Sequence, residues 1–243
     1  MSHLICLSNG LTYRLENNRN KMIDMLEIFN HDGVELNFPF PELLLNFKLT
    51  KRNIKFINQL KFVSLHLPWV NISYDKNVLT HKIITKVQNL SRVIKINNLV
   101  IHPLQINNFD LLNKFGLPVS IENEDPKMPK FFTPEDFQKI FDQNPKLYFN
   151  FDFAHARLVS DKNVEDFIKN FKDKIIEIHL SSLKKGDVDH WFLKPRDSAI
   201  NRALIRKLRS IDNAAVVLEC VAKDKKDLNK TKDEIKYIRE LLN

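Results

Sequence analysis

The amino-acid sequence predicts an α/β protein folded as a single (β/α)8 TIM barrel over residues 1–243. Eight short apolar runs recur along the chain, and a segment that suits a helix separates each run from the next. The runs are almost continuously apolar, as strands of a parallel sheet are when helices cover it. Eight such units in a chain of this length match one closed barrel, and we find no linker between them.

The predicted strands lie at residues 4–7, 33–38, 62–67, 99–102, 119–122, 147–153, 175–180 and 215–220. The predicted helices lie at residues 20–30, 40–59, 77–96, 133–142, 161–171, 198–210 and 231–242. Two helix starts carry N-terminal signals, namely Thr133 before Pro134, and Thr231 with Glu234 at capping-box spacing. Between the fourth and fifth strands, residues 105–114 leave room for a short helix only.

Hydrophobic residues make up 43% of the chain, which suffices for a large core. No apolar stretch reaches membrane length and the first residues lack a signal-type run, so we expect a cytoplasmic protein with no membrane partner. Cys6 and Cys220 form neither a metal-type spacing nor a disulfide framework, and reduced thiols are expected. They fall on the first and eighth strands, which adjoin in a closed barrel. Cys220 should face the helices if Glu219 faces inward.

The formal net charge of +8 would suit a polyanion, which makes DNA a candidate partner. The basic residues are dispersed, however, and the abundance of Lys, Asn and Ile also fits an AT-rich genome. The chain has four glycines and no Gly-rich phosphate-binding loop. Charge alone therefore leaves the partner open.

Histidine and carboxylate side chains stand where the predicted strands end. The stretch 147–156 is the clearest case, because Asp152 and His155 appear just as an aromatic apolar run stops. Active sites of such barrels lie at the C-terminal ends of the strands. The full set is His66, His102, Glu122, Asp152, His155, His179, His190 and Glu219.

One histidine after a strand is most often a satisfied hydrogen-bonding group, and one inward glutamate can pair with a lysine. This many acidic and imidazole groups in one poorly solvated cavity would instead destabilise each other unless a cation lay among them. Imidazole nitrogen and carboxylate oxygen together suit zinc best, with manganese or iron as alternatives. The set therefore predicts a site for divalent metal ions.

The order of the motifs resembles the xylose-isomerase-like barrel superfamily, which includes the endonuclease IV family and small sugar isomerases and epimerases. The motifs are His-x-Pro-Trp, Ile-His-Pro, Ile-Glu-Asn, Asp-x-x-His-Ala, Ile-His-Leu and Leu-Glu, from about the second strand to the eighth. The resemblance implies one divalent ion on a quartet of residues and two further ions in an endonuclease IV-like member. The implied quartet is Glu122, Asp152, His179 and Glu219.

By the same resemblance, His66 and His102 would hold a second ion with Glu122 as the bridge. His155 and His190 would hold a third, which gives one to three ions per chain. The family has an aspartate as the third ligand of that ion, two residues before the last histidine, and Val188 stands there. Asp187 and Asp189 flank it and could replace it. The loop after the second strand also lacks the arginine expected of a DNA-penetrating loop.

Three functions remain open from the sequence. The surplus of histidines favours an endonuclease IV-like phosphoesterase that acts on phosphodiesters of the abasic-DNA type. A sugar or sugar-phosphate isomerase or epimerase would need one ion, with Glu122 and Glu219 shuttling a proton and His155 contacting the substrate. Trp69 would line the substrate pocket in both cases. A barrel that binds metal without turnover is the third possibility.

Overall fold

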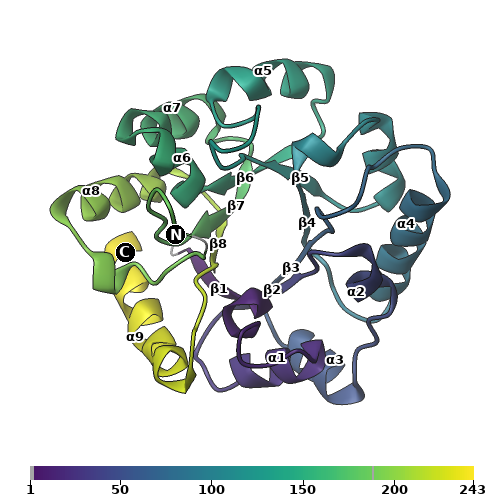
Figure 1. Cartoon of the computed structure of the whole chain (residues 1–243), viewed down its shortest axis with the longest axis horizontal. Coiled ribbons are helices and arrows are strands. Elements are labelled where there is room, and N and C mark those ends of the chain that lie inside the picture. Colours follow the sequence, from purple (N-terminus) through teal and green to yellow (C-terminus); the bar gives the residue numbers. More distant parts are fainter. Residues whose placement is uncertain (1–2, 188) are drawn as a thin grey trace.

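Eight parallel strands pair in the order of the sequence, and β1 closes the ring by pairing with β8. The computed structural model describes residues 3–187 and 189–243. Helices surround the barrel on its outside, as Figure 1 shows in a view along the barrel. The predicted closed (β/α)8 barrel is confirmed.

The strands are β1 Leu4–Ser8, β2 Gly33–Asn37, β3 Phe62–His66, β4 Asn98–Ile101, β5 Val119–Glu122, β6 Tyr148–Asp152, β7 Ile175–Leu180 and β8 Ala215–Leu218. Each overlaps a predicted apolar run. The largest difference is at β8, where Glu219 and Cys220 follow the strand and do not belong to it.

The helices are α1 Arg19–Leu26, α2 Pro41–Leu45, α3 Lys51–Ile57, α4 Val78–Ser91, α5 Pro134–Gln143, α6 Phe153–Val159, α7 Asp161–Phe171, α8 Ala199–Lys207 and α9 Lys225–Leu242. The helix predicted at 40–59 is two helices, because the Thr50 side chain caps a new helix by accepting from the Asn53 N–H. Between β4 and β5 the chain forms only the short 3₁₀ segments Pro103–Gln105 and Phe109–Phe115, as expected.

The start predicted for the last helix is wrong. α9 begins at Lys225, where the Asp224 carboxylate accepts from the Asp227 N–H at 2.8 Å. Thr231 and Glu234 have capping-box spacing but lie inside the helix on its buried face. An aspartate before a longer amphipathic segment is an equally good N-cap, so spacing alone did not determine the start.

The barrel interior is unusual at mid-depth, because its buried side chains are polar where branched apolar residues commonly fill such barrels. Toward the N-terminal ends of the strands, Cys6, Ala215 and Val217 form a small apolar cluster. The polar residues of the next layer are Glu35, Ser64, Asn98, Ser120 and Glu177, all fully buried. Among the described helices, none combines the length and apolar character needed to cross a bilayer.

Candidate metal centre

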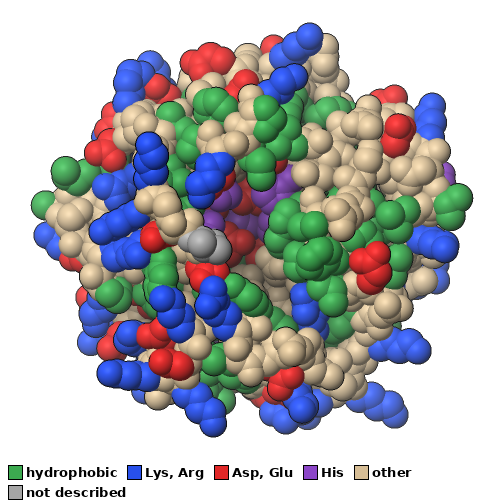
Figure 2. Space-filling view, viewed as in Figure 1, with side chains coloured by type: hydrophobic (Ala, Val, Ile, Leu, Met, Phe, Trp, Pro, Cys, Tyr) green, Lys and Arg blue, Asp and Glu red, His purple; other side chains and the backbone are tan. Residues whose placement is uncertain are grey.

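The predicted site residues meet at the mouth, by which we mean the end of the barrel where the C-terminal ends of the strands converge. Figure 2 shows this face with a hollow at its centre, and histidine and acidic side chains at the bottom of the hollow. Strands β3, β5, β6 and β7 supply four of the side chains directly, His155 lies in α6, and the loops after β4, β7 and β8 supply the other three. All eight residues belong to one connected cluster of contacts.

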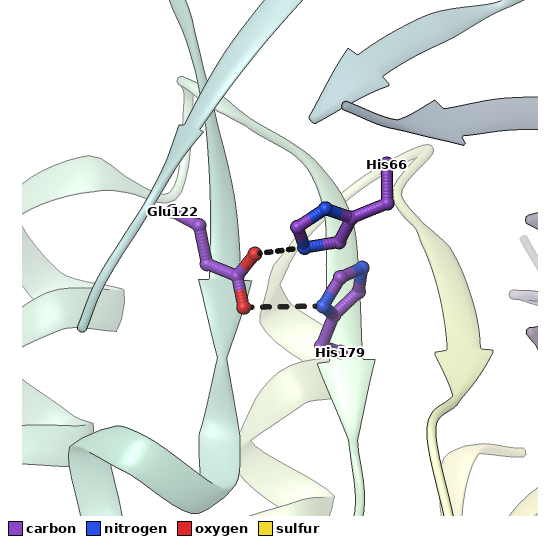
Figure 3. A group of neighbouring side chains, drawn as sticks. All are labelled: His66, Glu122 and His179. Atoms are coloured by element: carbon purple, nitrogen blue, oxygen red, sulfur yellow. Dashed lines mark hydrogen bonds and ion pairs between the residues drawn. The ribbon is translucent and has the colours of Figure 1, made fainter. Parts of the chain in front are cut away.

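Glu122 is the centre of this cluster. Its Oε2 lies 3.0 Å from His66 Nε2, and its Oε1 lies 3.2 Å from His179 Nδ1 (Figure 3). His102 Nε2 lies 3.9 Å from the same Oε2. Burial would raise the pKa of Glu122, but His179 and His102 hold it well below its ordinary value. Glu122 is therefore placed to bridge two groups of ligands.

The four residues of the implied quartet offer ligand atoms that all lie within 4.8 Å of one another: Glu122, Asp152, His179 and Glu219. Glu219 Oε2 lies 3.3 Å from His179 Nδ1. Burial opposes ionisation of Glu219, yet the charge and hydrogen bond of His179 lower its pKa to about 2. Burial would lower the pKa of His66, but Glu122 raises it to about 9. Within the cluster, carboxylates and histidines that lie next to each other therefore stabilise each other's opposite charges.

His155 and His190 also come together, although they lie on separate segments. Their ring centroids are 5.3 Å apart, and both offer ligand atoms within 4.8 Å of Asp152. The aspartates expected as substitutes in the third site are held elsewhere. Asp187 pairs with Arg196, and Asp189 accepts from Tyr13 at 2.6 Å and pairs with Arg14. Neither belongs to the group, and Val188 lies outside the described residues.

Each of the five histidines has one ring nitrogen engaged by a neighbouring oxygen atom. The contacts are His66 Nδ1 to Leu67 O, His102 Nδ1 to Glu124, His155 Nδ1 to Asn123 O, His179 Nε2 to Glu35, and His190 Nδ1 to Ser181 Oγ. The second nitrogens of His66, His102 and His179 face Glu122. Metal-binding histidines typically have such an outer partner, which fixes the tautomer and the ring orientation.

Sequence reasoning missed the outer partners Glu35 and Glu124, and also the buried Glu177, whose carboxylate lies 3.8 Å from His179 Nε2. A signal was present for two of these three residues. Glu35 is a lone acid inside an apolar strand. Glu177 precedes His179 by two residues, so Glu177 and His179 lie on the same face of β7.

Trp69 is half-buried beside the cluster. Its ring centroid lies 4.6 Å from that of His66 and 5.6 Å from that of His102. It therefore lines the mouth next to the histidines, where the sequence predicted a pocket wall.

The cluster contains a buried oxygen atom that a cation would satisfy. Asp152 Oδ1 accepts from the His155 N–H at 2.6 Å, whereas Oδ2 is buried and has no hydrogen-bond partner among the described residues. Burial raises the pKa of this carboxyl. Buried polar atoms are normally paired, and a bare carboxylate oxygen among imidazoles suits a divalent ion. The residues present therefore fit a metal site.

No protein-family model matches the chain, and no curated protein matches it. Solved structures do. A D-tagatose 3-epimerase-like protein has a TM-score of 0.70 at 19% identity, covering 99% of this chain and 98% of its own. Endonuclease IV from Thermus thermophilus has a TM-score of 0.67 at 12% identity, covering 98% of each chain.

A xylose isomerase domain protein from Alicyclobacillus acidocaldarius has a TM-score of 0.71 at 12% identity, over 99% of both chains. Similarities at these identities concern the fold. They confirm that the chain has the fold of the xylose-isomerase-like TIM barrels, which the order of its motifs predicted. One fold of this kind can host many activities, so the substrate depends on the side chains of the site.

Proposed function

We propose that the chain is a divalent-metal-dependent phosphoesterase of the endonuclease IV type, acting on phosphodiesters such as those of abasic DNA. The observation that carries the proposal is the group formed by Asp152, His155 and His190. An isomerase that uses one ion needs only the quartet. A second set of histidines close to a quartet residue favours chemistry with more than one ion.

Three overlapping sets of residues would hold the ions. The quartet Glu122, Asp152, His179 and Glu219 would take one ion. His66 and His102 would take a second with Glu122 as the bridge. Asp152, His155 and His190 would take a third. We propose zinc as the preferred metal, with manganese or iron as alternatives, and two or three ions per chain.

Divalent ions in these sites would supply positive charge against a phosphoryl group and would lower the pKa of water. The chain's own residues would divide the remaining work. Glu219 has a side chain 17% exposed, more than Glu122 or Asp152, so of these three carboxylates it is the most accessible to water or substrate entering at the mouth. Burial opposes protonation of His155, but Asp152 and Glu122 raise its pKa to about 8, so His155 would have to release a proton near neutral pH in order to bind the third ion.

The rim supports DNA as a partner only weakly. Arg14 and Arg196 near the mouth are already paired with Asp189 and Asp187. Trp69 offers an aromatic face beside His66 on which a base or a sugar could stack.

The two buried free thiols agree with a reducing compartment, so we propose the cytoplasm as the location.

A duplex with one abasic site tests the proposal. In the presence of zinc or manganese, the protein should nick this duplex and leave an intact duplex of the same sequence uncut. Binding should weaken steeply as salt rises, because phosphate contacts release counterions. His190→Ala should reduce nicking strongly. An untouched abasic duplex, together with turnover of a ketose or its phosphate, would reject the phosphoesterase.

A sugar or sugar-phosphate isomerase or epimerase is the second candidate. The observation in its favour is that the quartet is complete by itself, with Glu122 and Glu219 both within 3.3 Å of His179 Nδ1. Two carboxylates beside one ion could move a proton between adjacent carbons of a sugar. Conversion of a ketose with added manganese, unaffected by His190→Ala, would support this candidate.

A further inference from the structure

His179 lies between two layers of carboxylates. Its Nδ1 faces Glu122 and Glu219 on the mouth side, at 3.2 and 3.3 Å. Its Nε2 faces the barrel interior, where Glu35 Oε2 lies at 2.9 Å. The ring of His179 and the carboxylate of Glu35 are fully buried. Both nitrogens of the ring therefore have an acceptor, and only one of them can bind a metal ion of the quartet.

Glu35 has a single hydrogen-bonding role among the described residues. One carboxylate oxygen faces His179, and the other, Oε1, is buried without a partner. Burying a carboxylate costs several kcal/mol, and an apolar side chain of similar size would fill the same space more cheaply. The one contact that distinguishes Glu35 from such a side chain is the hydrogen bond to His179.

Glu177 is a natural comparison in the same layer. It is equally buried, but its oxygens accept from Ser64 and from Asn98, each at 2.6 Å. Its nearest oxygen lies 3.8 Å from His179 Nε2, which is beyond hydrogen-bonding distance. Glu177 thus adds charge near His179 without directing a particular ring hydrogen.

We propose that Glu35 is a positioning residue that keeps the ring hydrogen of His179 on Nε2 and so leaves the Nδ1 lone pair for the metal ion. A neutral imidazole carries one hydrogen, and Glu122 and Glu219 would both draw it to Nδ1. Glu35 opposes this from the other side of the ring. The inference rests on the proposed metal binding by the quartet and names the residue that prepares one of its ligands.

The test compares zinc affinity and the His179 tautomer in three proteins. Glu35→Leu removes the acceptor and should lower zinc affinity of the quartet by about 10–100-fold. Glu177→Gln, the matched control, removes a charge from the same layer and should change affinity by less than about threefold. In ¹H–¹⁵N spectra of the zinc-loaded wild type, His179 should carry a hydrogen-bonded, slowly exchanging hydrogen on Nε2.

Equal zinc affinity and an unchanged Nε2 hydrogen signal in Glu35→Leu would overturn the inference. A wild-type protein that binds no zinc or manganese would instead overturn the proposed metal function, and this inference with it. If Glu35→Leu does not fold, Glu35→Gln decides. It keeps an acceptor oxygen but loses the charge, so the Nε2 hydrogen signal should shift and affinity should fall further than in Glu177→Gln. Equal behaviour of the two glutamine variants would also reject the role of Glu35.

Discussion

Glu122 contacts a different histidine with each of its two carboxylate oxygens, and a third histidine approaches it. One residue thus joins the proposed sites for the first and second ions. A single substitution at this position should disturb both sites without disturbing the strand that carries it.

Glu122→Gln should abolish activity, by at least about 10²-fold, because one oxygen becomes an NH₂ group that cannot bind a metal ion. The fold should remain intact, since the C-terminal ends of barrel strands serve function more than stability. Activity, bound metal and melting temperature measure the effect. Glu240→Gln, at an exposed side chain of α9, is the matched control. Unchanged activity and metal content in Glu122→Gln would contradict the account.

The sequence placed Cys6 correctly on β1, but Cys220 lies just beyond the end of β8 and not on that strand. Cys6 is on β1 in the small interior cluster, and Cys220, just after β8, packs in the core shared with the helices. Burial raises the pKa of both thiols well above the ordinary value. Both should react with a thiol reagent only after unfolding. Cys220→Ala should keep full activity and lose about 1 kcal/mol of stability in a denaturant titration. Loss of activity in a folded variant would contradict this orientation.

At the scale of elements, periodicity predicted the strands well because each one is a short apolar run bounded by polar residues. The helices were less predictable. α6 was missed because it begins directly after β6 with Asp152 as its N-cap, so a site residue also serves as a helix signal. Glu234 does not cap its own helix. It accepts from the N–H groups of Leu193 and Lys194, a contact between distant segments that local sequence patterns do not reveal.

Glu234 should make stability depend on pH. Burial raises its pKa from 4.5 to about 7, against the opposing hydrogen bonds from Leu193 and Lys194. Because the folded pKa is the higher one, the folded state binds the proton more tightly. The stabilisation is complete below pH 4.5 and is lost as pH rises through about 7. The loss is about 3 kcal/mol at roughly 1.36 kcal/mol per unit.

Glu234→Gln should remove this part of the pH dependence. Urea unfolding at about pH 4.5 and about pH 8 measures the difference, and wild type should lose about 3 kcal/mol more than the variant between the two. Glu240→Gln on the same helix should behave as wild type. Parallel losses in wild type and Glu234→Gln would show that this carboxyl titrates normally.

At the scale of the whole molecule, closure of the barrel brings residues from six strands or their following loops to one mouth. That convergence made the site predictable from sequence, because every parallel strand presents its C-terminal end there. Three details were not predictable. The inner layer with Glu35 depends on which face of each strand points into the barrel. The grouping of Asp152 with His155 and His190 depends on distances between side chains that are remote in sequence. The sequence also could not tell whether Asp187 and Asp189 turn toward the metal site or, as they do, toward Arg196 and Arg14.

Divalent ions should stabilise the entire fold, because the ligands come together only in the closed barrel. Zinc at about 100 times its Kd should add about 2.7 kcal/mol to the free energy of unfolding. For a domain of this size, the melting temperature should rise by about 5–10 °C relative to chelator-treated protein. Glu122→Gln should show a smaller rise. Identical melting with chelator and with zinc would mean that the folded protein does not bind the ion preferentially.

The number of ions bound per chain tests the central claim most directly. Elemental analysis of the purified protein, after loading with zinc and removal of free ions, gives this number. Our account predicts two or three ions per chain, with one ion fewer in His190→Ala. A single ion per chain, unchanged in His190→Ala, would contradict the multi-metal phosphoesterase and favour the isomerase. No bound ion at all would contradict the metal centre itself.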